Sequence, residues 1–197
     1  MDLSGVRDHG PTAVTDEDRE SAVVVPVLDG GTRLLFTKRA EHLPNHPGQM
    51  SFPGGRREPA DETLRETALR EGREEVGLDA ERVRFVGRLD DIRTVTNFSV
   101  RPFVAQVPDR RYDLCSPEVA ETAPLSLAAL TDRENYDSER RDHPHHGEIR
   151  LHYFRVDGYT VWGATARMLA QFLELATDWS APSEVDRVVD PDAEFPV

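Results

Sequence analysis

Cysteine, lysine and long apolar runs are all scarce in this sequence of 197 residues. Because Cys115 is the only cysteine, an internal disulfide and a cysteine-rich metal site are both excluded. There is no run of about 18 apolar residues and no signal-peptide pattern, so we expect a cytoplasmic protein that does not enter a membrane. A chain of this length suits one domain with a sizeable core.

Lysine is replaced almost entirely by arginine, and acidic residues outnumber both. Lys38 is the only lysine among 24 basic residues, whereas Asp and Glu number 37, which gives a formal net charge of -13. This balance argues against a protein that grips nucleic acid through a basic surface. A lysine-poor acidic composition resembles that of proteins from salt-rich cytoplasm, where salt screens the self-repulsion. We therefore expect a halophilic source.

The most clearly marked element is a helix predicted over about 61–76. Thr63 and Glu66 have the spacing of a capping box, Asp61 is a rival N-cap, and Gly77 is a typical helix stop. Small or apolar residues recur at every fourth position and form a narrow stripe for packing: Leu64, Ala68, Gly72 and Val76.

The other face of this helix carries Arg70 and three carboxylates, Glu71, Glu74 and Glu75, which are neighbours at spacings of three and four. One interpretation is a solvated acidic face, softened by an Arg70 to Glu74 pair. The glycine-proline turn just upstream favours a different interpretation, a metal site. Oxygen-only clusters suit Mg²⁺ or Mn²⁺, which commonly lie between carboxylates and substrate phosphates. We therefore expect a divalent site for a phosphate ester or anhydride.

These residues resemble the Nudix box, G-x5-E-x7-R-E-U-x-E-E-x-G-U, of a family that hydrolyses a nucleoside diphosphate linked to another moiety. The sequence departs from the general box twice. Gly55 lies one residue further from Glu62, and Gly72 stands at an aliphatic position, which costs about 1 kcal/mol of helix stability relative to Ala. The resemblance implies the Nudix α/β/α sandwich, with a mixed sheet between the box helix and a late helix.

The loop at 35–58 closely resembles the coenzyme A diphosphatase branch of that family. Its Pro, Gly and His content alone indicates a long surface loop. The order of residues in the loop matches the branch signature at Arg39, Leu43, His46, Gly48, Gln49, Ser51, Phe52, Pro53, Gly54 and Gly55. The branch also has the extra residue after Gly55. The resemblance therefore implies hydrolysis of coenzyme A to 3',5'-ADP and 4'-phosphopantetheine by water attacking phosphorus.

The resemblance also implies roles for individual residues. Glu71, Glu74 and Glu75 would hold Mg²⁺ or Mn²⁺, and Arg70 would orient these carboxylates. Glu118 is the expected general base, on a loop after the box, with Glu121 as its rival. The expected substrate contacts are Lys38, Arg39, His46, Gln49, Gly54 and Gly55.

Within that set, an arginine fork at Arg39, followed by Lys38, is the expected reader of the 3'-phosphate, and the glycine amides allow close backbone approach. His46 is equally compatible with a structural hydrogen bond. Two other functions stay open: a Nudix hydrolase for another nucleotide, such as ADP-ribose or a nucleoside triphosphate, and a non-catalytic nucleotide-binding module. The intact carboxylates disfavour the module.

The remaining sequence predicts a Nudix domain over 21–177, between an N-terminal arm at 1–20 and a flexible acidic tail at 178–197. A strand hairpin is expected at 21–28 and 33–38, with Pro26 at an edge or a bulge. Further strands are expected at 83–86, 92–95, 98–107, 151–156 and 159–161, and helices at 124–130 and 163–176. The histidines at 143–146 favour a polar loop over a zinc site. A homodimer is compatible with the sequence.

Overall fold

The computed structural model of the chain describes residues 1–17, 19–94, 97–143, 147–190 and 193. In chain order its elements are α1 (Ser4–Asp8), β1 (Arg19–Leu28), β2 (Arg33–Arg39), β3 (Met50–Ser51), β4 (Gly54–Arg56), α2 (Leu64–Val76), β5 (Arg84–Arg88), β6 (Ile92–Arg93), β7 (Phe98–Val107), β8 (Val119–Ser126), α3 (Leu127–Leu130), a 3₁₀ turn (Arg133–Asn135), β9 (Tyr136–His143), β10 (Gly147–Val156), β11 (Tyr159–Val161), α4 (Gly163–Ala176) and β12 (Arg187–Val189).

The larger sheet is mixed, as the sequence predicts. Its order is β3-β2-β1-β7-β5, and β4, β6 and β8 join it at β1, β7 and β2. β1 runs parallel to β7 along its whole length, whereas β1 and β2 form the predicted antiparallel hairpin. β1 is therefore the central strand around which the site is built.

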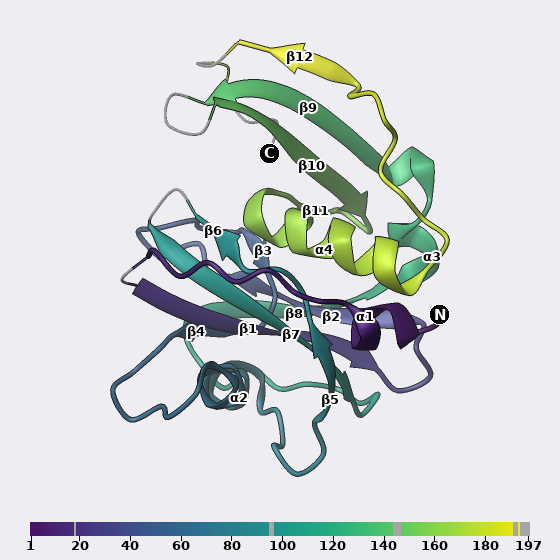
Figure 1. Cartoon of the computed structure of the whole chain (residues 1–197). Helices are drawn as coiled ribbons and strands as arrows, with labels where there is room; N and C mark the ends of the chain where they lie inside the picture. The colour runs from purple at the N-terminus through teal and green to yellow at the C-terminus, as the bar shows by residue number, and fades with distance from the viewer. Residues whose placement is uncertain (18, 95–96, 144–146, 191–192, 194–197) are drawn as a thin grey trace.

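Helices cover both faces of this sheet, α2 on one side and α4 on the other (Figure 1). The alternation along β1 explains the division, because successive side chains of a strand point to opposite faces. Val23, Val25 and Val27 belong to the core that contains α4, whereas Ala22 and Val24 belong to the core under α2. The predicted α/β/α sandwich is confirmed.

A second sheet covers the outer side of α4 (Figure 1). The sequence predicted its strands at 151–156 and 159–161, which are part of β10 and the whole of β11, but not β9 and β12. Its order is β11-β10-β9-β12. Phe154 and Val156 of β10 share the core with α4. The strand β9 has the sequence YDSERRDH, which lacks the alternation of apolar and polar residues that identifies a half-buried strand.

The predicted flexible tail is wrong over the part that the structure describes, because β12 pairs in parallel with β9. Asp186, just before β12, accepts a hydrogen bond from the Ser138 amide at 2.8 Å and pairs with Arg133 at 2.5 Å. Asp186 therefore anchors the segment that leads into β12. The N-terminal arm is docked as well, since α1 inserts the buried Val6 into the α4 core.

Two local predictions also need correction. Pro26 lies in the central strand and not at an edge; β1 pairs with β4 from Ser21 to Val23 and with β2 at Val27, and Pro26 falls between the two stretches. The helix predicted at 124–130 is shorter, because the strand β8 continues to Ser126. Ser126 caps the short helix, because its hydroxyl accepts a hydrogen bond from the Ala129 amide.

Two further predictions lie at the margin of the described residues. Of the strand predicted at 92–95, the structure has only β6 (Ile92–Arg93): Thr94 is not part of a strand, and residue 95 lies outside the described part. The possible histidine site includes residues 144–146, which also lie outside it. Within the described ranges, no helix is long and apolar enough to cross a bilayer.

Candidate active site

The helix α2 is fixed at both ends by the predicted caps. The Thr63 hydroxyl accepts from the Glu66 amide at 3.2 Å, and the Glu66 carboxylate accepts from the Thr63 amide at 3.0 Å. Gly77 adopts φ 65, and its amide donates to the Arg73 carbonyl at 3.0 Å. The helix begins at Leu64, so Thr63 is the N-cap and the rival Asp61 is not.

The departure of the sequence at Gly72 has a packing cause. The predicted stripe faces the sheet, and all four of its residues are buried. A Cβ at Gly72 would lie 2.6 Å from the Leu78 Cδ1 atom, where Leu78 folds back under the helix. Glycine at this position therefore makes room for Leu78, and the carboxylates on the other face are not affected.

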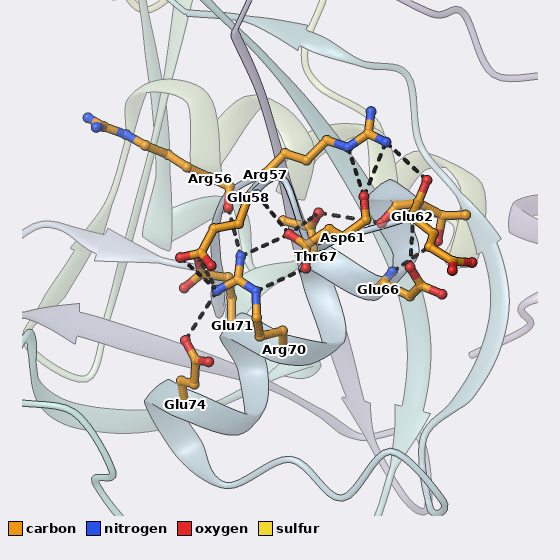
Figure 2. Close-up of polar contacts among 11 residues, drawn as sticks. Arg56, Arg57, Glu58, Asp61, Glu62, Glu66, Thr67, Arg70, Glu71 and Glu74 are labelled. Carbon is orange, nitrogen blue, oxygen red and sulfur yellow. Dashed lines mark hydrogen bonds and ion pairs between the residues drawn. The ribbon is translucent and has the colours of Figure 1, made fainter.

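Arg70 is the hub of the exposed face of α2 (Figure 2). Its Nε and Nη2 atoms donate to the two carboxylate oxygens of Asp61, both at 3.0 Å. Its Nη1 atom donates to Glu71 at 3.1 Å and to Glu74 at 3.2 Å. Nη2 also donates to the Arg56 carbonyl at 2.9 Å. This is the geometry that an orienting role for Arg70 requires.

The partner that fixes Arg70 is Asp61, which the sequence suggested only as a helix cap. Asp61 is 8% exposed and also accepts from the Thr67 hydroxyl and the Glu58 amide, both at 2.9 Å. The bidentate bond to Arg70 holds the pKa of Asp61 well below its usual range. Only the turn at 57–61 brings the two side chains together, so spacing along the helix gave no signal of this pair.

The glycines before the box are required by close packing. Gly54 has φ 152, and a Cβ there would lie 2.5 Å from the Val23 Cα atom. A Cβ on Gly55 would lie 2.5 Å from the carboxylate carbon of Glu71. The Gly54 amide, which the sequence assigned to the substrate, donates to the Glu75 Oε2 atom at 3.0 Å. The loop therefore positions the carboxylates directly.

Glu71 and Glu75 are held close together in a poorly hydrated place. Burial raises the pKa of Glu75 to about 7, with a further increase from the charge on Glu71, against the Gly54 hydrogen bond and the charge on Arg39. Burial likewise raises the pKa of Glu71, although Arg70 opposes the effect. A cation at this point would stabilise both ionised forms.

The donor set suits a hard divalent cation, since it consists of carboxylate oxygens. It is not assembled in advance: among the residues that the structure describes, no three His, Cys, Asp or Glu side chains converge on one metal position. Arg70 explains why, because it draws the carboxylates of Glu71 and Glu74 to itself. The metal assignment of Glu71, Glu74 and Glu75 stays a prediction.

Arg39 lies at the end of β2, close to the carboxylates. Its amide donates to the Gln49 carbonyl at 3.0 Å, and its carbonyl accepts from the Gly48 amide at 3.2 Å. Its Nε atom is buried and has no hydrogen-bond partner in the described part of the chain. The charge of Arg39 lowers the pKa of Glu75. The Nζ atom of its neighbour Lys38 lies 3.7 Å from the Oε1 atom of Glu41.

His46 and Gln49 lie further along the same loop. His46 is exposed and takes a left-handed conformation with φ 54, and its carbonyl accepts from the Gln49 amide at 3.3 Å. The side-chain Nε2 atom of Gln49 would lie 3.5 Å from a Cβ atom placed on Gly163, at the start of α4. No contact joins His46 to the described carboxylates, so its substrate role stays a prediction.

The two candidate bases differ in their surroundings. The Glu118 carbonyl accepts from the Ala40 amide at 2.8 Å, next to Arg39, and the charge of Glu118 raises the pKa of Glu75. Glu121 instead accepts a hydrogen bond from the Tyr159 hydroxyl, which ties it to β11. Glu118 is therefore the better placed of the two.

A family model for the NUDIX domain matches residues 18–157. The chain therefore belongs to the NUDIX family. It is similar to the "Uncharacterized Nudix hydrolase NudL" of Enterobacter sp. (strain 638), with 37% identity over 158 residues that cover 78% of this chain and 80% of that protein. It is also similar to "Nudix hydrolase 3" of Caenorhabditis elegans, with 35% identity over 186 residues that cover 84% of this chain and 77% of that protein.

Among solved structures, the MutT protein from Methanosarcina mazei Go1 matches 62% of this chain and 83% of its own, with a TM-score of 0.46 and 23% identity. The family model and the sequence relatives carry the assignment. The chain is a Nudix hydrolase that acts on nucleoside diphosphate derivatives. Nudix enzymes generally use divalent ions such as Mg²⁺ or Mn²⁺.

Proposed function

We propose that this Nudix hydrolase cleaves the diphosphate bond of coenzyme A to give 3',5'-ADP and 4'-phosphopantetheine. The observation that carries the proposal is the match of the loop between Arg39 and Gly55 to the coenzyme A branch. The loop's contacts support it, since Gly54 donates to Glu75 and Gly55 packs against Glu71. A stretch that both matches one branch and touches the box carboxylates is suited to setting substrate choice.

The proposed chemistry distributes four tasks over this chain. A divalent ion held by Glu71, Glu74 and Glu75 would neutralise diphosphate charge and lower the pKa of the attacking water. Arg70, fixed by Asp61, keeps the carboxylates in position. Arg39 binds the diphosphate through its guanidinium. Glu118 takes the proton of the attacking water.

We further propose that the enzyme works in a salt-rich cytoplasm. The acidic, lysine-poor composition supports this, because a net charge of -13 repels itself unless salt screens it. Circular dichroism melts in low salt and in about molar salt test it. A melting temperature that does not rise with salt would rule it out.

The test of the function is a product-resolved assay in molar salt with Mg²⁺ and with Mn²⁺. The panel contains coenzyme A, its acylated and oxidised forms, ADP-ribose and a nucleoside triphosphate. Release of 3',5'-ADP and 4'-phosphopantetheine at the highest kcat/KM of the panel is the expected result. Preference for ADP-ribose or a triphosphate would replace this function with that of another Nudix hydrolase, and no turnover at all would favour a binding module.

A further inference from the structure

A cavity lies beside the box helix, where β1, β4 and β7 of the larger sheet meet. Its volume is about 430 Å³, and its lining includes Arg19, Arg56, Arg57, Asp61 and Phe98. Strand pairing brings them together: Arg19 of β1 is in register with Phe98 of β7, and Arg56 of β4 with Ser21 of β1. The cavity is therefore part of the sheet framework.

Two guanidinium groups lie over one phenylalanine ring in this cavity. The guanidinium carbon of Arg19 is 3.8 Å from the centroid of the Phe98 ring, and that of Arg56 is 4.9 Å from it. An arginine over an aromatic face is attracted by the ring, which holds the charge in a defined place. Phe98 thus serves as a common support for two like charges.

The three acids that line the cavity have arginine partners. Glu20 pairs with Arg57 at 2.7 Å, and Asp61 and Glu58 lie 3.0 and 3.8 Å from Arg70. Arg56 is exposed, and within the described residues its guanidinium has no carboxylate partner. In a protein with an excess of acidic residues, an arginine without a carboxylate partner, held against the same ring as a second arginine, is suited to an anionic ligand.

The cavity adjoins the catalytic face without overlapping it. The Arg56 carbonyl accepts the bond from Arg70, and the residue before it, Gly55, packs against Glu71. Figure 2 shows the Arg56 side chain extending away from the carboxylates, while its main chain lies at Arg70. A ligand group in the cavity would therefore be adjacent to a diphosphate at Glu71 but separate from it.

We propose that Arg56 and Arg19, supported by Phe98, bind the ribose 3'-phosphate of the substrate. This inference rests on the proposed function, in which a 5'-diphosphate and a 3'-phosphate share one ribose and are separated by only a few bonds. It differs from the expectation that Arg39 reads the 3'-phosphate, and it leaves Arg39 for the diphosphate, as in the proposed function. A phosphate dianion fits paired guanidiniums through charge-assisted bonds.

The kinetic test compares coenzyme A with dephospho-coenzyme A, which lacks the 3'-phosphate. Arg56→Ala should raise KM for coenzyme A about ten-fold, because a charge-assisted contact to phosphate is lost, and should change KM for dephospho-coenzyme A less than about two-fold. Arg19→Ala should act in the same direction. Arg39→Ala should impair both substrates equally.

Arg65→Ala is the matched control, because Arg65 lies over the Phe85 ring at 4.1 Å and is outside the cavity. It should leave both KM values unchanged. If Arg56→Ala impaired both substrates equally, or if only Arg39→Ala discriminated between them, the proposal would be overturned while the coenzyme A activity stood.

A binding measurement separates this proposal from the proposed function. Calorimetric titration with 3',5'-ADP and with 5'-AMP needs no turnover, so it remains decisive even if coenzyme A is not hydrolysed. The unmodified chain should bind 3',5'-ADP about ten-fold more tightly than 5'-AMP, and Arg56→Ala should abolish the difference. Equal affinities in the unmodified chain would overturn the cavity assignment.

Discussion

Two glutamates of this protein are withdrawn from water, one in the second sheet and one on the box helix. Glu139 of β9 is 1% exposed, and it accepts hydrogen bonds from the Tyr153 hydroxyl and from Arg141, both at 2.9 Å. Arg187 adds a contact at 3.4 Å. Glu75 of α2 has the Gly54 amide, but it also faces the like charge of Glu71.

The difference separates a structural acid from a functional one. The charge of Glu139 is compensated by two arginines, so its surroundings are complete without a ligand. The charges of Glu71 and Glu75 are partly desolvated and repel each other, and they are compensated only in part, because Glu71 shares Arg70 with Asp61 and Glu74 and Glu75 has the Gly54 amide. Incompletely compensated charge of this kind is typical of a site that awaits a cation.

The largest effect should come from removing one of the proposed metal ligands on the box helix. Glu74→Gln and Glu75→Gln should each lower turnover by about a thousand-fold, because each removes a proposed ligand of the divalent ion. Stability should not fall, since one of several repelling charges is lost. The measurements are kcat for coenzyme A and a urea melt. Near-normal turnover in both variants would refute the metal assignment.

The reverse outcome is expected for the compensated acid. Glu139→Gln removes the buried ion pair between Glu139 and Arg141, which should lower the free energy of unfolding by about 3 kcal/mol, with little change in kcat per folded molecule. Glu148→Gln is a matched control on the same strand pair, because the exposed pair of Glu148 and Arg140 should contribute less than about 1 kcal/mol. Equal losses in the two variants would remove the distinction between them.

A smaller effect on turnover is expected for the carboxylate that fixes the hub. Asp61→Asn should lower kcat about ten-fold, because Arg70 loses its charged bidentate partner and no longer holds Glu71 and Glu74 in place. Asp91→Asn breaks a similar buried pair with Arg101, away from the box, and should reduce stability without reducing kcat. Unchanged kcat in Asp61→Asn would show that Arg70 needs no such anchor.

The smallest effect is a pH dependence that belongs to the second sheet. Burial lowers the pKa of His152, which is hydrogen-bonded to the Tyr136 hydroxyl, from 6.5 to about 4. The unfolded chain therefore takes up this proton first, and stability falls as the pH drops from about 6.5 towards 4. At pH 5.5 the loss should be roughly 1 kcal/mol relative to pH 7. Urea melts of His152→Gln should lack this component, and an unaltered pH dependence would contradict the assignment.

The same two regions differ in how far sequence predicts them. The box helix, the strand β7 and the helix α4 carry strong local signals, namely caps, alternation and a helical apolar period, and all three occur as predicted. The strands β9 and β12 were missed because their charged residues are compensated by partners distant in sequence, such as Glu139 of β9 with Arg187 of β12.

The same limit applies within the site. The carboxylates of α2 could be recognised because one helical turn brings them together. The Asp61 to Arg70 pair and the Arg56 cavity depend on a turn and on strand register, which no local pattern specifies. Gly72 shows the opposite case, a local irregularity whose cause, Leu78, is visible only in the fold.

The most direct test of the central claim is calorimetric titration of Mn²⁺ into the protein in molar salt. The account predicts that the unmodified chain and Glu139→Gln bind Mn²⁺ alike, because Glu139 is already compensated, and that Glu75→Gln binds it at least about ten-fold more weakly. It would be contradicted if Glu75→Gln bound Mn²⁺ as tightly as the unmodified chain.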